Sequence, residues 1–150
     1  MASTDMLVQE GHVAIALSVA DANGSFGAFD SVWDTFDGGS VRASSRTYRP
    51  GGGAPEELTV GFPTVEEITL SRGYRVGRDT RAEATLLSSI GHMCQVTKYV
   101  QYPYSVQEVP ETRRTYTGRI VGVTTPKGRS DGGEDIATLS VTIGVQGLPK

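Results

Sequence analysis

The chain has 150 residues and a formal net charge of −3, with 37% hydrophobic and 21% charged residues. This length predicts one domain that can bury a core of its own. The acidic balance argues against a dedicated nucleic-acid-binding protein, because the arginines are scattered and form no basic cluster. The single cysteine, Cys94, excludes an intrachain disulfide and is consistent with a reducing compartment. No apolar run is long enough to span a bilayer, and the first residues lack the features of a signal peptide.

The first extended segment is expected at residues 12–20, where large apolar residues alternate with small or polar ones. Downstream, Phe29, Trp33 and Phe36 have the spacing of a short helical turn or an irregular packed loop. We expect these aromatics to fill the core or a subunit contact. Residues 41–49 predict a strand that is polar on both faces, which is typical of a strand that faces solvent, a lumen or another chain.

A loop is expected at residues 50–57, because two prolines surround three consecutive glycines. Extended patterns resume at residues 57–61 and 65–74. In the second of these segments, Ile68 and Leu70 share one face with Glu66 and Arg72, and the two apolar residues are expected to anchor this face in the core.

One short helix is predicted near residues 80–90. Thr80 and Glu83 have the spacing of a capping box, in which both side chains satisfy free backbone donors. Gly91 follows as a natural C-terminal stop. The apolar stripe of this helix comprises Ala82, Leu86 and Ile90, with Leu87 beside it.

Three further strands are predicted at residues 93–102, 115–124 and 136–146, the last with the most regular alternation in the chain. A polar hairpin loop at residues 125–135 connects the final two. About seven strands and one helix in a single domain, residues 1–150, predict a mainly β fold: a β-sandwich or barrel with one packed α-helix.

Signatures of catalysis or metal binding are weak. His92 and Cys94 share a face of a predicted strand, but a metal site needs more ligands, so we expect both to be structural. The glycine-rich segments match no phosphate-binding loop, because no Gly-Lys-Ser/Thr follows them. One acidic cluster lacks the ligand spacing of a calcium loop. It comprises Asp131, Glu134 and Asp135. We therefore expect no enzyme, no metal and no cofactor.

The segment GAFDSVWDTFDGGSVRASSRTYRPGGGAPEELTVGFPTVEEITLSRGY resembles the signature region of the major tail tube proteins of long-tailed bacteriophages. In those chains a tryptophan segment leads into a strand that starts with Gly-Gly. A Tyr-Arg-Pro-Gly-Gly loop follows, and then a Thr-Val-Glu strand that ends in Ser-Arg. Phe62 departs from the pattern, since many relatives carry a glycine there. The matching residues are Trp33, Gly38, Gly39, Val41, Tyr48, Arg49, Pro50, Gly51 and Gly52, followed by residues 64–72.

The resemblance implies a ring-forming fold related to the tubes of contractile tails and of type VI secretion. In such tubes six subunits close a ring with a continuous inner β-barrel, and stacked rings form a hollow tail that conducts DNA. The implied partners are further copies of this chain and other tail proteins such as the tape measure and the terminator. DNA would pass through the lumen without specific binding, and no membrane is involved. The implied location is the virion tail, assembled in the host cytoplasm.

The resemblance also suggests which residues contact other subunits. The loop at residues 50–57 would reach the neighbouring subunit or the next ring. Arg72 would emerge at the rim of the sheet and pair with a carboxylate of the next copy. Its substitution by alanine would then leave the subunit folded and impair assembly, more at high salt than at low. The candidate contact residues are Arg46, Tyr48, Arg49, Pro50, Gly51, Gly52, Glu56, Glu57, Glu66, Glu67, Arg72 and Arg75.

Three other functions fit parts of the sequence. The chain could be the tube protein of a bacterial contractile injection system, or a terminator or connector that forms a single ring. It could also be a carbohydrate-binding β-sandwich, for which Tyr99, Tyr102 and Tyr104 are the only candidate aromatic platform. An enzyme ranks last among these alternatives.

Overall fold

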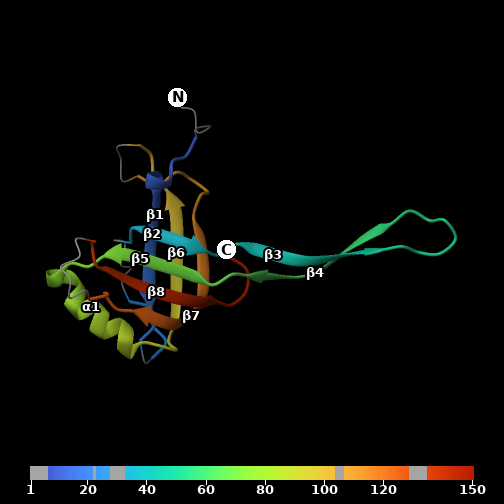
Figure 1. Ribbon diagram of the computed structural model, residues 1–150. Coiled ribbons are helices and arrows are strands. Elements are labelled where there is room, and N and C mark those ends of the chain that lie inside the picture. Colours follow the sequence, from blue (N-terminus) through green and yellow to red (C-terminus); the bar gives the residue numbers. More distant parts are fainter. Residues whose placement is uncertain (1–6, 22, 28–32, 104–106, 129–134) are drawn as a thin grey trace.

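The computed structural model describes residues 7–21, 23–27, 33–103, 107–128 and 135–150 (Figure 1). These residues form eight strands, one α-helix and a short 3-10 helix. The mainly β class with one helix is confirmed. The elements are η1 (Glu10–His12), β1 (Val13–Val19), β2 (Thr35–Gly38), β3 (Val41–Tyr48), β4 (Glu57–Val65), β5 (Ile68–Gly73), α1 (Val76–Ser88), β6 (Met93–Val100), β7 (Arg114–Thr124) and β8 (Thr138–Val145).

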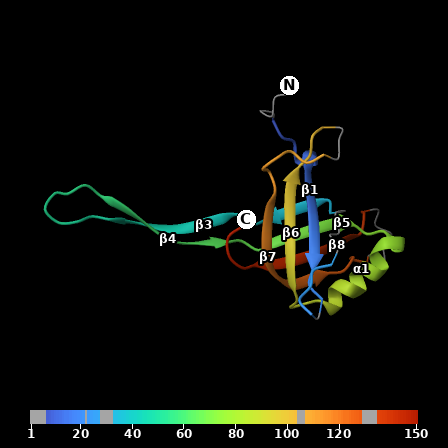
Figure 2. The ribbon, with the colours of Figure 1, turned by 180° about the vertical axis from the view of Figure 1, so that it is seen from behind.

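Six of the strands form one antiparallel sheet in the order β1-β6-β7-β8-β5-β2. The sheet curls so strongly that β5 and β8 run across the direction of β1 and β6 in both ribbon views (Figures 1 and 2). The sheet therefore encloses its core as a half-barrel. Strands β3 and β4 pair only with each other and form a separate two-stranded hairpin.

The sheet bends at β7. The first half of this strand pairs with β6, and its second half pairs with β8. Between Ile120 and Gly122 the register with β8 shifts by one residue, which is a β-bulge that increases the local bend. Close approach of the two backbones requires glycine here, because a Cβ on Gly118 would overlap the carbonyl oxygen of Gly144.

The core lies inside the curl and contains residues from most strands of the sheet. Trp33 is buried in it, as expected, whereas Phe29 lies outside the described residues. The expectation of a helical turn or loop around Phe36 was wrong, because this residue belongs to strand β2. The ring centroids of Phe36 and Tyr116 are 5.6 Å apart. The buried cluster comprises Ile15, Leu17, Trp33, Ile68, Leu70, Leu86, Cys94, Val96, Tyr116, Ile120, Leu139, Val141 and Ile143.

Helix α1 begins four residues earlier than predicted. Its N-cap residue is Arg75, whose side chain makes no capping hydrogen bond. The predicted capping box was wrong: the hydroxyl of Thr80 lies inside the helix and donates to the carbonyl of Val76 at 2.7 Å. Of the predicted stripe, Leu86 is buried, whereas Ile90 lies beyond the end of the helix and is half exposed.

A buried ion pair fixes the start of α1 to the sheet. Arg72 of β5 is only 1% exposed, and its Nη2 lies 2.7 Å from Oδ1 of Asp79, which is fully buried. The guanidinium of Arg72 also lies over the ring of Trp33, 4.4 Å from its centroid. The prediction that Arg72 emerges at the rim of the sheet was wrong. Because it shares the face of Ile68 and Leu70, its side chain is drawn inward, and Asp79 neutralises it there.

Asp79 receives hydrogen bonds from three further donors. Arg78 donates through Nε and Nη2 at 2.9 Å each, and the backbone N–H of Arg75 donates at 2.8 Å. The pKa of Asp79 is lowered from 3.8 to about 2, chiefly by the hydrogen bonds from the Arg78 side chain. The hydrogen bond from the backbone of Arg75 and the charge of Arg72 lower it further, whereas burial raises it. The carboxylate therefore organises the helix start that the sequence assigned to Thr80.

Substitution of Arg72 by alanine is expected to destabilise the subunit by about 3 kcal/mol or more, because it leaves Asp79 buried without its partner in the sheet. Denaturant unfolding followed by the fluorescence of Trp33 measures this. Arg46→Ala, at an exposed position, serves as the control and is expected to change stability by less than about 0.5 kcal/mol. An Arg72→Ala variant as stable as this control would contradict the structural role of the pair.

The lowered pKa of Asp79 also predicts a pH dependence. A carboxyl group with a depressed pKa in the folded state contributes stability that is complete above its unfolded pKa near 4 and is lost as the pH falls towards 2. The difference in unfolding free energy between wild type and Asp79→Asn is therefore expected to shrink by about 2 kcal/mol over that range. A difference that is constant with pH would show that Asp79 is not ionised in the fold.

Candidate assembly surfaces

The β3–β4 hairpin extends far from the body as an arm (Figures 1 and 2). It continues the β2–β5 pair of the main sheet, because only residues 39–40 separate β2 from β3 and only residues 66–67 separate β4 from β5. The backbone N–H of Glu66 donates to the carbonyl of Ser40 at 3.0 Å, so the ribbon stays hydrogen-bonded across this junction.

The junction is a bend that two glycines make possible. Gly38 and Gly39 have φ angles of +87° and +75°, a region that other residues rarely adopt. A Cβ on Gly38 would also overlap the carbonyl oxygen of Glu67. Just beyond the bend, Arg42 Nε lies 3.5 Å from Glu66 Oε1. The direction of the arm is thus set by backbone geometry and supported by one exposed ion pair.

Every residue of β3 and all of β4 except Val65 are exposed, so the prediction that the first of these strands faces away from its own core is confirmed. The second strand is longer than the predicted 57–61 and carries the apolar residues Leu58, Val60 and Phe62. The sequence interpretation missed these as candidate contact residues. The signal was present in the alternation of Leu58 and Val60, which places both on one face of a strand.

Most of the predicted contact residues lie on the arm. Arg46, Tyr48, Arg49, Glu56 and Glu57 are exposed there, and so are the loop residues Gly51 and Gly52, whereas Pro50 is half buried. Arg49 and Glu56 form an ion pair across the loop, with Arg49 Nε donating to Glu56 Oε1 at 3.1 Å. Arg49 and Glu56, which are both candidate contact residues, therefore pair with each other within one chain.

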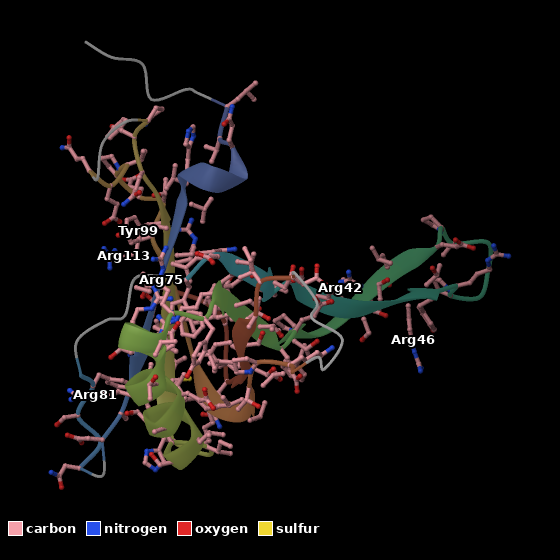
Figure 3. All side chains as sticks on the ribbon, turned by 60° about the vertical axis from the view of Figure 1, so that its left-hand side comes forward. Arg42, Arg46, Arg75, Arg81, Tyr99 and Arg113 are labelled. Atoms are coloured by element: carbon pink, nitrogen blue, oxygen red, sulfur yellow. The ribbon has the colours of Figure 1, made fainter. Side chains whose placement is uncertain are left out.

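The remaining predicted residues are not gathered at one place. Figure 3 shows Arg42 near the base of the arm and Arg46 further along it, with Arg75 on the body. Glu66 and Glu67 are exposed at the bend, and Arg75 is exposed at the start of α1. Arg72 is buried and cannot reach a neighbouring copy without unfolding of this region.

Of the three tyrosines considered for the carbohydrate-binding alternative, Tyr99 and Tyr102 are described, and both are partly buried. The guanidinium of Arg113 lies 5.0 Å from the ring centroid of Tyr99, and it donates to Glu108 at 2.7 and 3.1 Å. Figure 3 labels Arg113 and Tyr99 near each other on the body. The hydrogen bond from Arg113 lowers the pKa of Glu108. Tyr102 is half buried, and Tyr104 lies outside the described residues.

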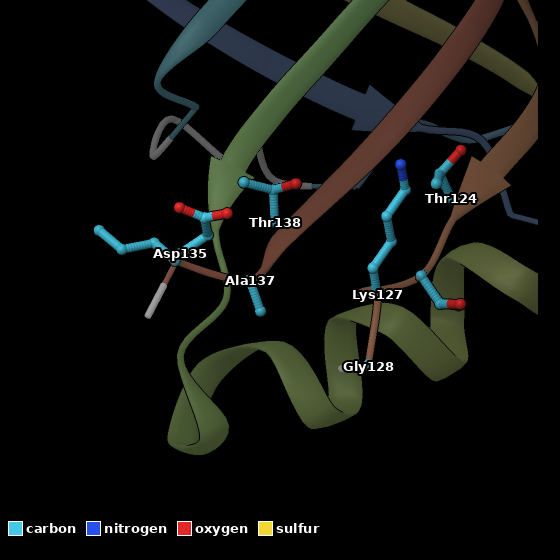
Figure 4. Close-up of a pocket in the computed structure, with 8 residues that line it drawn as sticks. Thr124, Lys127, Gly128, Asp135, Ala137 and Thr138 are labelled. Atoms are coloured by element: carbon cyan, nitrogen blue, oxygen red, sulfur yellow. The ribbon is translucent and has the colours of Figure 1, made fainter. Parts of the chain in front are cut away.

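Several shallow hollows lie on the described part of the body. One of about 330 Å³ lies where β7 ends and β8 begins, lined by Thr124, Lys127, Asp135 and Thr138 among others (Figure 4). Within the described parts of the chain, no group of three His, Cys, Asp or Glu side chains could hold a metal. Two residues of the predicted acidic cluster, Asp131 and Glu134, lie outside those parts, as does most of the predicted loop at 125–135.

Burial raises the pKa of the Cys94 thiol to about 12. No helix among the described residues has the length and apolar character of a membrane span.

Comparison with known proteins finds similarity in structure only. No protein-family model matches the chain, and no curated protein matches it in sequence. A structure of the anti-feeding prophage cap, the tube-terminating cap, matches with a TM-score of 0.64 at 12% identity over 100% of this chain and 93% of that one. The sheath/tube terminator of the extracellular contractile injection system PVC gives 0.65 at 12% identity, over 99% and 98% of the two chains.

A chain of the PVC sheath–tube complex gives a TM-score of 0.64 at 14% identity, over 98% of this chain and 93% of that one. These similarities, at low identity and nearly full length, show the fold. Tube-related proteins of contractile injection systems share this fold. The resemblance in sequence implied a fold related to such tubes.

The loop at residues 50–57 is expected to exchange amide hydrogens fast in the free subunit and slowly in an assembly. Its three glycines leave the backbone free, and it lies exposed at the end of the arm. Hydrogen–deuterium exchange on subunits and on sedimented assemblies measures the difference, with the buried strand β8 as the internal control. Equal exchange of the loop in both states would exclude it from subunit contacts.

Proposed function

We propose that this chain is a ring-forming structural subunit of the tube of a phage-tail-like particle. The observation that carries the proposal is the full-length structural similarity to chains of tube and tube-terminator assemblies. The role is structural and not enzymatic. Its partners are further copies of the chain and other tail proteins, and its location is the tail of the particle.

The structure supports ring formation through its unpaired edges. β1 and β2 are the outer strands of the six-stranded sheet, and among the described residues no further strand pairs with the outer edge of β2. Free sheet edges favour pairing with another chain, and closure into a ring removes them. The arm adds a second contact that extends well beyond the body. A six-fold ring agrees with the similarity of this chain to one from the six-fold symmetrised structure of the anti-feeding prophage baseplate.

Two positions in a tube fit this fold. Two of the similar structures are a tube-terminating cap and a sheath/tube terminator, which favours a terminator that forms a single ring. The similarity to a chain of the sheath–tube complex favours a subunit that stacks. In a long-tailed phage the stacked rings would conduct DNA, and the net charge of −3 would limit DNA binding along the wall.

Negative-stain electron microscopy of the purified chain over a range of concentrations tests the proposal. We expect closed rings, either single or stacked into tubes. Single rings at all concentrations would identify a terminator, and long tubes would identify a tube subunit. A chain that remains monomeric throughout would contradict the proposed function.

A further inference from the structure

The outer face of the curled sheet carries rows of short hydroxyl side chains on β2, β5, β8 and the second half of β7. Opposing residues of an antiparallel pair have side chains on the same face of a sheet. The hydroxyls of Ser71 and Ser140 lie 3.0 Å apart and share a hydrogen bond. They belong to a row in which each residue lies directly opposite the next: Thr124, Ser140, Ser71 and Thr35.

The neighbouring row has a similar character. Thr142 lies between Gly122 and Thr69, and Asp37 of the edge strand β2 follows opposite Thr69. Within the described strands, Asp37 is the only charged residue that the register places on this surface. Arg119 lies beside it, on the first half of β7, and donates to the carbonyl of Gly91 at 2.9 Å. We call the surface the hydroxyl face, and it comprises Thr35, Thr69, Ser71, Thr124, Thr138, Ser140 and Thr142.

The described part of the chain leaves the hydroxyl face uncovered. All of its side chains are exposed or half buried. On β1 and β6, in contrast, Ser18 and Thr97 alternate with core residues and are only 1% and 2% exposed. Ser18 there donates to the carbonyl of Gly27 at 2.7 Å. Helix α1 does not cover the hydroxyl face either, because Leu86 and Asp79 attach it to the core side of the sheet.

The shape of the body determines which way the hydroxyl face would point in a closed ring. The core, helix α1 and the strands β1 and β6 all lie on the other side of β5 and β8 (Figures 1 and 2). This side of the sheet is therefore much the thicker. Since the outside of a ring has the larger circumference, the thick side fits the outside and the hydroxyl face fits the lumen.

An uncharged wall favours one class of cargo over another. A conduit for DNA has to exclude cations, whereas carboxylates along its wall would help by repelling the phosphates. The chain has 17 Asp and Glu residues, yet in the described strands only Asp37 lies on the hydroxyl face. A polypeptide carries both signs of charge, so a wall of either sign would form ion pairs with it. The near absence of both signs therefore fits a polypeptide better than DNA.

We propose that the hydroxyl face lines the lumen of the ring and that the cargo it faces is a polypeptide of mixed charge. This inference rests on the proposed function and adds to it the wall and the class of cargo. Short hydroxyl side chains bond to each other, as Ser71 and Ser140 do, or to water. They offer a passing chain no fixed charge and no long side chain to hold it.

Gold labelling tests which side of the ring the hydroxyl face occupies. Thr142→Cys places a thiol on the hydroxyl face, and Ser88→Cys places one on the exposed surface of α1 as the control. Cys94 does not compete for the label, because it is buried and the pKa of its thiol is about 12. Each variant is labelled with a maleimide gold cluster, and its rings are viewed end-on by electron microscopy.

We expect gold in the central channel for Thr142→Cys and at the periphery for Ser88→Cys. Gold at the periphery for Thr142→Cys would overturn the inference while leaving the proposed function intact. Failure of the wild-type chain to form any ring would contradict both.

Charged variants of the wall test the class of cargo. Assemblies are sedimented with a fluorescent copolymer of lysine and glutamate in equal amounts, or with fluorescent single-stranded DNA. Wild-type assemblies are expected to retain neither probe. Thr142→Glu is expected to retain about 10-fold more copolymer and no DNA, whereas Thr142→Lys retains both probes, because weak ion pairs from many copies add together. Ser88→Glu and Ser88→Lys measure binding to the outside and are expected to retain no more than wild type.

Two outcomes of this experiment would overturn the inference. Wild-type assemblies that retain the copolymer but release DNA would identify a conduit for DNA. Thr142→Glu assemblies that retain no more copolymer than wild type would show that an uncharged wall is not needed for a polypeptide. Ser140→Glu and Ser140→Lys repeat the comparison at a second position of the hydroxyl face, and circular dichroism checks that each variant is folded.

Discussion

The rest of the structure depends on the bend in β7, because a six-stranded sheet without a second sheet against it must bury one face by curling onto itself. The bulge between Ile120 and Gly122 and the close backbone approach at Gly118 allow a single strand to pair with β6 on one side and β8 on the other. The two halves of the sheet then cross and enclose the core. This closure also leaves the β2–β5 pair free to continue outward as the arm.

The buried pair between Arg72 and Asp79 connects the sheet to helix α1. A guanidinium inside the core is costly unless it is neutralised and hydrogen-bonded. Asp79 supplies the neutralising carboxylate, and the guanidinium of Arg72 lies over the ring of Trp33. The residue that the sequence suggested for contacts between subunits therefore stabilises the fold of one subunit. In the ring that we propose, contacts between copies would be made by the exposed arm and the sheet edges.

The sequence predicts the regular parts of this fold and not those that depend on distant contacts. Strands β1 and β8 were predicted because period-two alternation is a local signal, and β2 was missed because four residues of mixed polarity pair only through β5. The start of α1 was misplaced because Thr80 and Glu83 match a local capping pattern, whereas the true start depends on Asp79. The alternation did place Arg72 on the inward face, but its partner seven residues later was not recognised. The exposure of Phe62 follows from a bulge that no local pattern indicates.

The proposed function depends on contacts between copies, and the exposed arm is the surface that we propose for them. The most direct test is a cryo-electron microscopy reconstruction of the assembled rings at side-chain resolution. We predict that the arm of each subunit contacts another copy in the closed ring, and that Arg72 remains paired with Asp79 inside its own subunit. An arm that projects into solvent in the closed ring, or an Arg72 side chain that crosses to a neighbouring copy, would contradict it.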